Sequence, residues 1–466
     1  MTPTVDIALV RGPSPTRGAL AGLPVPPLGM LYVAGALERA GWRVAVVDAE
    51  AEGLDAAGFT RRVRELAAPV VGLSGMTPMV DRMRATIRLI RPWTERIVLG
   101  GVHATRFREK ALADLDVDAL VIGEGEAPAP ALLSWWTGGS VGDPPPGVMV
   151  QGQPFVEATP PKDLGALAWP ARHLVPHDRY RYLFQTAPGF TTFISSRGCP
   201  FRCTFCDKTV SGSPWRARPP GDVVDELVEV KERYGLNYVC IFDDNFTLRR
   251  KRVVAICEEI LRRGLRIEWK CEARVDGLDV ELARLMAAAG CKTIAFGVES
   301  GNQESLDLLK KDQTVPRMHA AIAACRAAGI ETVAYVLVGI PGETPATSME
   351  TLRFAVDSRL DFIQFSTLSP FPGTELYDQA VAEGWFRRTR VVNPVDSEAL
   401  RATLVPPGWT EEDLARTLRQ LYGGFYLRPR YLARQALRAG RQGTLVPRAR
   451  LGLQVARWVF DGWRAA

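Results

Sequence analysis

Short apolar runs alternate with longer amphipathic segments over roughly the first 135 residues of the chain. Five of these runs are rich in β-branched residues and have the length of strands that are buried on both faces of a parallel sheet. They cover residues 6–10, 43–48, 70–74, 96–100 and 119–123. Helical patterns lie between them, for example at 28–40 and 79–91. The first half, residues 1–140, is therefore predicted to be a doubly wound, Rossmann-like sheet of the flavodoxin type.

A second series of strand and helix patterns follows a Pro- and Gly-rich stretch, residues 141–188, which we interpret as a linker. Six apolar runs, each followed by a helical pattern, predict a partial, TIM-like (βα)6 barrel over residues 189–400. The remaining residues, 401–466, form a small, helical and arginine-rich segment. The six predicted strands are 191–197, 237–243, 266–271, 292–298, 331–338 and 361–367.

Length, composition and charge indicate how many domains the chain has and where in the cell it is expected. A chain of 466 residues is larger than one hydrophobic core usually supports, so two or three domains are expected. No apolar run reaches the roughly 18 residues of a membrane span, and no leader-like segment is recognisable, so a cytoplasmic protein is expected. The net charge of +6 comes from the tail, because nine arginines face the single acid Asp461 in residues 428–466. The rest of the chain is slightly acidic, which argues against a nucleic-acid-binding surface.

Small residues follow three predicted strands of the first half, at 74–77, 100–105 and 123–126. Because the carboxyl ends of parallel strands meet at one edge of the sheet, these residues form a flat floor for a broad ligand. The first strand is not followed by G-x-G-x-x-G, which argues against a dinucleotide.

Cys199, Cys203 and Cys206 have C-x3-C-x2-C spacing directly after the first strand of the second half. Three thiolates can hold three corners of a cubane iron–sulfur cluster and leave the fourth iron open. A structural zinc site is the alternative, but it usually needs four ligands, and no further Cys or His follows within about 30 residues. The other five cysteines lie singly in apolar stretches, where buried and unreactive thiols are expected.

Polar residues and turns also follow the other strands of the second half, and barrel chemistry concentrates at these carboxyl ends. Each group has a simpler structural interpretation. Asp243 and Asp244 could cap a helix, and Arg274 and Glu299 could form a buried ion pair. The segment 339–343 could be an ordinary strand-to-helix turn.

The cysteine spacing, with the aromatic Phe205 before the last cysteine, resembles the radical S-adenosylmethionine (SAM) superfamily. The resemblance implies a [4Fe–4S] cluster on Cys199, Cys203 and Cys206 whose open iron binds SAM. An electron, supplied by a partner such as flavodoxin or ferredoxin, then cleaves SAM to a 5′-deoxyadenosyl radical. The residues that it implies for SAM binding are Phe205, Asp243, Asp244, Arg274, Glu299, Ser300, Gly339, Pro341 and Gly342.

The first half resembles the cobalamin-binding domain that precedes the barrel in one branch of this superfamily, through segments 26–35, 100–105 and 123–126. A D-x-H-x-x-G loop is absent, so the resemblance implies base-off cobalamin without a protein histidine ligand. His103 is expected to pack near the corrin or its tail, and cobalt ligation by His103 is the less favoured alternative. The implied cobalamin contacts are Ser74, Thr77, Gly100, Gly101, His103, Thr105, Gly123, Glu124, Gly125 and Glu126.

The tail around 425–431 is similar to the end of the subgroup that includes anaerobic magnesium-protoporphyrin ester cyclase and hopanoid-associated enzymes. Arginines recur at helical spacing at positions 430, 434, 438 and 441. We favour a solvated basic face for this helix, with peripheral contact to a membrane that carries a lipid substrate as the alternative.

These resemblances imply a cobalamin-dependent radical SAM enzyme that methylates an unactivated carbon of a small-molecule or lipid-like substrate through methylcobalamin. Radical cyclisation or rearrangement without methyl transfer is the alternative within the family. A cobalamin or iron–sulfur sensor is disfavoured because a sensor would not need the SAM-binding rim. We expect the substrate-selecting contacts near His173, His177 and Tyr180 and in the C-terminal segment.

Overall fold

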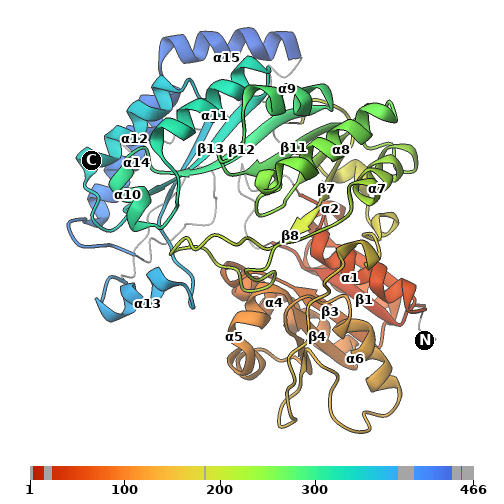
Figure 1. The fold of residues 1–466 in the computed structure, drawn as a ribbon. Helices are drawn as coiled ribbons and strands as arrows, with labels where there is room; N and C mark the ends of the chain where they lie inside the picture. Colours follow the sequence, from red (N-terminus) through yellow and green to blue (C-terminus); the bar gives the residue numbers. More distant parts are fainter. Residues whose placement is uncertain (1–3, 15–23, 183–184, 387–403, 443–452, 454–466) are drawn as a thin grey trace.

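The computed structural model describes residues 4–14, 24–182, 185–386, 404–442 and Leu453. Two six-stranded sheets make up most of the chain, and Figure 1 shows them one above the other. The first sheet has the strand order β2-β1-β3-β4-β5-β6, and the second has the order β14-β13-β12-β11-β10-β7. This arrangement confirms the predicted α/β fold with a doubly wound sheet followed by a partial barrel.

The first sheet contains the five predicted parallel strands and one more. Two cores cover its faces, because alternate residues of a strand point to opposite sides. Ile7 and Leu9 of β1 pack with helices α1 and α6, whereas Ala8 and Val10 pack with α3, α4 and α5. The strands are β1 (Ile7–Arg11), β2 (Val44–Asp48), β3 (Val70–Ser74), β4 (Arg96–Gly100), β5 (Ala119–Val121) and β6 (Val148–Met149). The helices are α1 (Leu28–Arg39), α2 (Ala49–Glu52), α3 (Ala56–Leu66), α4 (Val80–Ile90), α5 (Gly101–Asp114) and α6 (Pro128–Thr137).

The edge strand β6 was not predicted. It lies inside the segment interpreted as a linker and pairs antiparallel with β5. Two residues are too few for a recognisable strand pattern. Only the pairing of Val148 with Val121 in the folded chain identifies β6 as a strand.

The six strands of the second sheet are parallel, with helices over the outer face, as expected for a partial barrel. The strands are β7 (Phe190–Phe193), β10 (Tyr238–Ile241), β11 (Glu268–Ala273), β12 (Cys291–Glu299), β13 (Glu331–Val338) and β14 (Phe362–Thr367). The helices are α7 (Pro220–Glu232), α8 (Arg250–Arg262), α9 (Val280–Ala288), α10 (Gln303–Leu308), α11 (Val315–Ala327), α12 (Pro345–Asp357) and α13 (Glu375–Ala382).

The first barrel strand is shorter than predicted. It ends at Phe193, and Ser196–Arg197 forms a separate strand, β8, which pairs antiparallel with β9 (Arg216–Ala217). The backbone N–H of Ser195 donates to the Asp243 carboxylate, and the strand has ended before this residue. The predicted strand 191–197 is therefore wrong in its last four residues, and the cysteines follow β8 instead.

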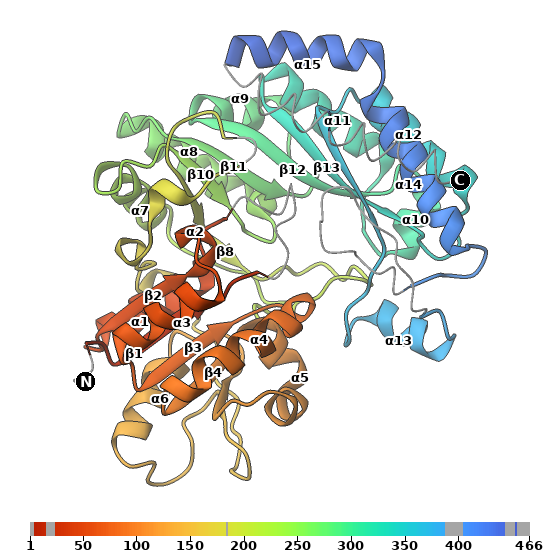
Figure 2. The same cartoon turned by 180° about the vertical axis from the view of Figure 1, so that it is seen from behind.

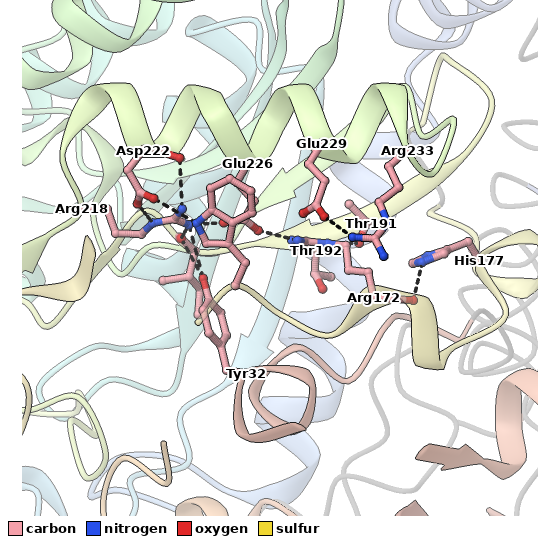
Figure 3. A network of polar contacts seen from close by, with 12 residues as sticks. Tyr32, Arg172, His177, Thr191, Thr192, Arg218, Asp222, Glu226, Glu229 and Arg233 are labelled. Carbon is pink, nitrogen blue, oxygen red and sulfur yellow. Dashed lines mark hydrogen bonds and ion pairs between the residues drawn. The ribbon is translucent and has the colours of Figure 1, made fainter. Parts of the chain in front are cut away.

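The segment between the sheets is fixed to both of them by buried side chains. Arg172 forms an ion pair of 2.5 Å with Glu226 of α7, and its Nη2 donates to the backbone oxygen of Thr192 at 3.0 Å. Arg218 contacts the same carboxylate, and Figure 3 shows this network between α7 and Tyr32 of α1. The linker is therefore an ordered connection between the two halves.

His173, His177 and Tyr180 belong to this connection. The Tyr180 hydroxyl donates to Asp48 at 2.8 Å, and His173 contacts Glu38 at 2.9 Å. His177 Nε2 contacts the backbone oxygen of Arg172 at 2.7 Å. Tyr180 and His173 thus join the linker to the first half, whereas His177 Nδ1 is buried without a partner among the described residues. The substrate contacts expected near these residues stay a prediction.

Helix α14 (Glu411–Tyr426) packs on the barrel, and α15 (Pro429–Gln442) lies across the end farthest from the first sheet (Figures 1 and 2). Arg434 donates to the backbone oxygen of Leu360 at 2.6 Å, and Arg438 pairs with Asp361 and Glu331. These two arginines contact the barrel, so the predicted solvated basic face is wrong for them. The exposed side of α15 carries Leu432 and Leu437, and the side chain of Arg441 lies outside the described residues. No helix in the described part of the chain has the length and hydropathy to cross a membrane.

Candidate active site

The three cysteines lie on one loop, residues 198–215, which we call the cysteine loop. The strands β8 and β9 pair at its two ends and form its neck. Gly198 begins the loop with a φ of 83°, and a Cβ there would lie 2.3 Å from the backbone oxygen of Pro214, so only glycine fits. Cys199 and Cys203 are half-buried and Cys206 is exposed. The three thiols thus lie on a loop whose two ends are held together by the pairing of β8 with β9.

The barrel holds the base of this loop through two neighbouring carboxylates. Asp243 is buried and accepts hydrogen bonds from Ser195 N, Ser195 Oγ and Ser196 Oγ, each at 2.6 Å. Asp244 is exposed and accepts from Gly198 N at 2.9 Å. Both carboxylates bind the preceding segment, so the alternative of a helix cap is not what the structure shows. Asp244 remains the one of the pair that an incoming ligand can reach.

Arg274, at the end of β11, lies directly beside the thiols. Its guanidinium is 3.6 Å from the ring centroid of Phe201, and its Nη1 is 3.9 Å from Cys203 Sγ. It also binds Asp276 at 2.9 Å and the backbone oxygen of Lys311 at 2.5 Å. Arg274 therefore places a fixed positive charge beside Cys203.

Glu299 pairs with Lys311 at 2.7 Å, and both side chains are buried. The alternative of an Arg274–Glu299 ion pair is therefore wrong, because each residue has its own partner. Glu299 has a φ of 62° at an irregularity in the pairing of β12 with β13. Such a backbone costs on the order of 1 kcal/mol in a non-glycine residue, so surrounding contacts must maintain it. Sequence reasoning missed Lys311, although the polar run after α10 was a signal.

The turn at 339–343 joins the same end of the barrel. Ser300 Oγ donates to Glu343 at 2.8 Å, and burial raises the pKa of this carboxyl group. Gly339, Pro341 and Gly342 form the backbone of the turn after β13. The structure therefore brings Ser300 and the turn together, as the predicted SAM site requires. Phe205 is half-buried, and Lys311 Nζ lies 5.9 Å from its ring centroid.

A cavity of about 200 Å³ opens at the carboxyl end of the first sheet. It extends between the sheet and helices α1 and α6 and is lined mainly by apolar side chains such as Leu9, Val98 and Leu132. Val210 and Ser211 of the cysteine loop also line it. Of the predicted cobalamin contacts, the cavity wall includes Ser74, Gly100, Gly101, Gly123, Glu124, Gly125 and Glu126.

Three predicted cobalamin contacts are not among the residues that line the cavity. Thr77 follows β3 and is half-buried. His103 is buried against Phe107, with ring centroids 4.8 Å apart, and burial lowers its pKa. Thr105 Oγ1 accepts from Gly123 N at 2.9 Å and therefore supports the cavity wall from behind.

The carboxylates of Glu124 and Glu126 bind arginines of the other half of the chain. Arg197 Nη1 lies 2.6 Å from Glu124, and its Nη2 lies 2.5 Å from Glu126. Arg216 also contacts Glu124. Arg197 lies shortly before the cysteines in the sequence. Its ion pair with Glu124 could not be predicted because the two residues are far apart along the chain.

The residues present fit the three implied cofactors. Thr204 Oγ1 and both polar atoms of the Gln313 side chain are buried without a partner among the described residues, which is rare unless a ligand or water completes the site. Thr204 follows Cys203, and Gln313 follows the segment that binds Arg274. The glycine-rich mouth and apolar depth of the cavity suit a flat corrin with a long tail. In the described part of the chain, no three His, Cys, Asp or Glu side chains are arranged to hold a single metal ion.

Comparisons with known proteins agree with this architecture. The family model of the B12 binding domain matches residues 16–133, and that of the radical SAM superfamily matches residues 193–355. An uncharacterized methyltransferase of Pyrococcus horikoshii is 28% identical over 94% of this chain and 96% of its own length. The anaerobic magnesium-protoporphyrin IX monomethyl ester cyclase of Cereibacter sphaeroides is 29% identical over 76% of this chain, which spans 60% of that cyclase.

A solved structure has the same fold. The radical S-adenosylmethionine methyltransferase TsrM of Kitasatospora setae, with cobalamin and a [4Fe-4S] cluster bound, superimposes with a TM-score of 0.68 at 21% identity. The match covers 88% of this chain and 81% of that one. The predicted family resemblance and its cofactors, a [4Fe–4S] cluster, SAM and cobalamin, are confirmed. The chain belongs to the radical SAM superfamily, in the branch in which a cobalamin-binding domain precedes the barrel.

Proposed function

We propose that this chain is a C-methyltransferase in which Cys199, Cys203 and Cys206 hold the [4Fe–4S] cluster and the cavity of the first sheet holds cobalamin. When bound, the cluster and SAM supply a hydrogen-abstracting radical, and cobalamin supplies the methyl group. The chain's own contribution is to bind these groups, to orient them and to keep water from the radical.

One observation carries this proposal: the cysteine loop contributes Val210 and Ser211 to the wall of the cavity in the first sheet. A ligand in that cavity therefore lies against the loop that carries the three thiols. Radical formation and methyl supply need such closeness, because the two reacting partners must be held a few ångströms apart.

The polar groups at the barrel end have roles that suit SAM. Asp244 is exposed beside the cysteines and can accept from the SAM amino group. Arg274 and Lys311 bring two positive charges to the same end, where they can bind the SAM carboxylate. Glu299 can accept from the ribose hydroxyl groups while Lys311 balances its charge.

We assign cobalamin a base-off state without a protein histidine ligand. His103 supports this assignment because it packs against Phe107 and is not among the residues that line the cavity. The apolar depth of the cavity offers space for the displaced nucleotide tail.

Radical cyclisation remains the second candidate function. The likeness to the protoporphyrin ester cyclase favours it, but this chain spans only 60% of that enzyme. The relative that the chain covers almost completely, at 96% of its length, is named a methyltransferase. The coverage therefore favours methyl transfer.

The electron donor that we propose is a small acidic carrier such as flavodoxin or ferredoxin. Arg106, Arg202 and Lys208 border an opening beside Cys203 and Cys206. Positive charge around a redox centre increases the rate at which an acidic partner associates.

The test is anaerobic reconstitution with iron, sulfide and hydroxocobalamin, followed by reduction in the presence of SAM. We expect 5′-deoxyadenosine together with S-adenosylhomocysteine once a substrate is supplied. The appearance of 5′-deoxyadenosine alone, with a converted substrate, would favour cyclisation. If the wild type forms no 5′-deoxyadenosine, the proposed radical methyl transfer is wrong.

A further inference from the structure

We propose that Glu124 is a positioning residue that couples cobalamin binding to the conformation of the cysteine loop. The inference rests on the proposed function, because it takes the cavity as the cobalamin site and the loop as the cluster site. It adds that the two sites help each other to bind their cofactors.

The geometry begins at the neck of the cysteine loop. Arg197 of β8 and Arg216 of β9 are opposite each other in the antiparallel pair, one at each end of the loop. Both guanidinium groups bind the single carboxylate of Glu124, at separate oxygens. One side chain of the first half therefore holds both ends of the loop.

The ion cluster is buried and electrically balanced. Glu124 and Glu126 are 4% and 6% exposed, and Arg197 and Arg216 are 8% and 11% exposed. A buried charge that loses its partner is strongly destabilised, so these side chains cannot separate freely. The turn 123–126 and the neck therefore keep one relative position.

The same turn forms part of the cavity wall. Gly123, Glu124, Gly125 and Glu126 all line the cavity, and Gly125 passes so close to Val33 that a Cβ would lie 2.9 Å from its side chain. The turn thus has little room to move without changing the cavity. A ligand in the cavity therefore contacts the turn whose Glu124 binds both arginines of the neck.

A second contact holds the middle of the loop. Arg106 of α5 forms an ion pair of 2.5 Å with Asp207, the residue after Cys206. Helix α5 begins at Gly101, which also lines the cavity. The first half therefore contacts the cysteine loop at two places, and both contacts lead back to the cavity wall.

Coupling between two sites is reciprocal: if the cluster strengthens cobalamin binding, cobalamin strengthens cluster binding by the same factor. We expect a factor of about ten, within the range typical of coupled sites in one protein. Glu124→Gln keeps the size of the side chain and removes its charge, so the coupling should fall towards one while both cofactors still bind.

The experiment measures hydroxocobalamin affinity by quenching of tryptophan fluorescence under anaerobic conditions. Wild type and Glu124→Gln are each titrated with and without the reconstituted cluster. We expect cluster-loaded wild type to bind about tenfold more tightly than the cluster-free protein, and the ratio to approach one in Glu124→Gln.

Glu38→Gln is the control, because Glu38 pairs with His173 of the linker and touches neither the loop nor the cavity wall. It should keep the wild-type ratio. If Glu124→Gln does not fold, Arg106→Gln removes the second contact at a half-buried position and should lower the ratio in the same direction.

Equal hydroxocobalamin affinities for cluster-loaded and cluster-free wild type would overturn the inference, as would an unchanged ratio in a folded Glu124→Gln. Either result would leave the proposed function intact. If wild type binds neither the cluster nor hydroxocobalamin, the proposed function itself fails.

Discussion

Arg172 and Glu226 form an ion pair of 2.5 Å in which neither side chain retains any exposed surface. Arg172 lies in the linker and Glu226 lies on α7, so the pair joins the connection between the two halves to the barrel (Figure 3). Such a pair makes the linker part of the folded core.

Replacing Glu226 by Gln should destabilise the protein by about 3 kcal/mol, because Arg172 and Arg218 would be left buried without their shared carboxylate. Urea unfolding followed by circular dichroism measures the change. Glu229→Gln, about one turn along the same helix, is the matched control, since its partner Arg233 is exposed. Equal unfolding midpoints for both variants would contradict the role of Glu226.

Replacing Cys203 by Ala should abolish the cluster and all formation of 5′-deoxyadenosine. Two thiolates cannot hold the cubane that three cysteines hold. Iron content and the visible absorbance of the cluster report cluster loading. The control is Cys257→Ala, a buried thiol on α8, which should keep full iron content. A Cys203→Ala protein with wild-type iron would remove the cysteine loop as the cluster site.

Replacing Lys311 by Met should weaken SAM binding by at least about tenfold, because an unpaired buried Glu299 either takes up a proton or moves. Isothermal titration calorimetry of the cluster-loaded protein measures the affinity. Lys310→Met is the neighbouring control, since Lys310 is exposed and pairs with the exposed Glu375. Comparable losses in both variants would show that charge alone, and not the Glu299 contact, matters.

Acid should destabilise the protein partly through His177. Burial lowers the pKa of His177 below its ordinary value of 6.5, so the folded protein resists protonation that the unfolded chain accepts. This contribution to stability is fully present above pH 6.5 and is lost as the pH falls from there through the lower folded pKa. His177→Asn should therefore flatten the fall of the thermal midpoint below pH 6.5. His173→Asn, at a more exposed site, is the control. A slope that His177→Asn leaves unchanged would assign the acid sensitivity to other groups.

Sequence patterns predicted those parts of the fold that depend on local periodicity. The strands 70–74, 96–100 and 331–338 match β3, β4 and β13 at both ends, because buried parallel strands are nearly pure apolar runs. The end of β7 was missed because Asp243, distant in sequence, draws Ser195 out of the strand pattern. The strand β6 is too short to leave a pattern.

Spacing along the chain predicted which residues gather at the barrel end, since consecutive strand ends must meet there. It could not predict which charges pair. Arg274 and Glu299 were natural partners by charge, yet Glu299 binds Lys311 and Arg274 binds Asp276. Likewise, the carboxylates of Glu124 and Glu126 were assigned to a ligand, whereas arginines from the other half occupy them. Pairings across such sequence distances depend on tertiary packing.

The narrow neck of the cysteine loop has a consequence for repair. Oxygen destroys exposed iron–sulfur clusters, and Cys206 is exposed. Because β8 and β9 close the loop on themselves, the segment that carries the thiols contributes no strand to either large sheet. We therefore expect that an oxidised cluster can be lost and rebuilt while both hydrophobic cores stay folded. Damage to the cluster would then be reversible without unfolding of the chain.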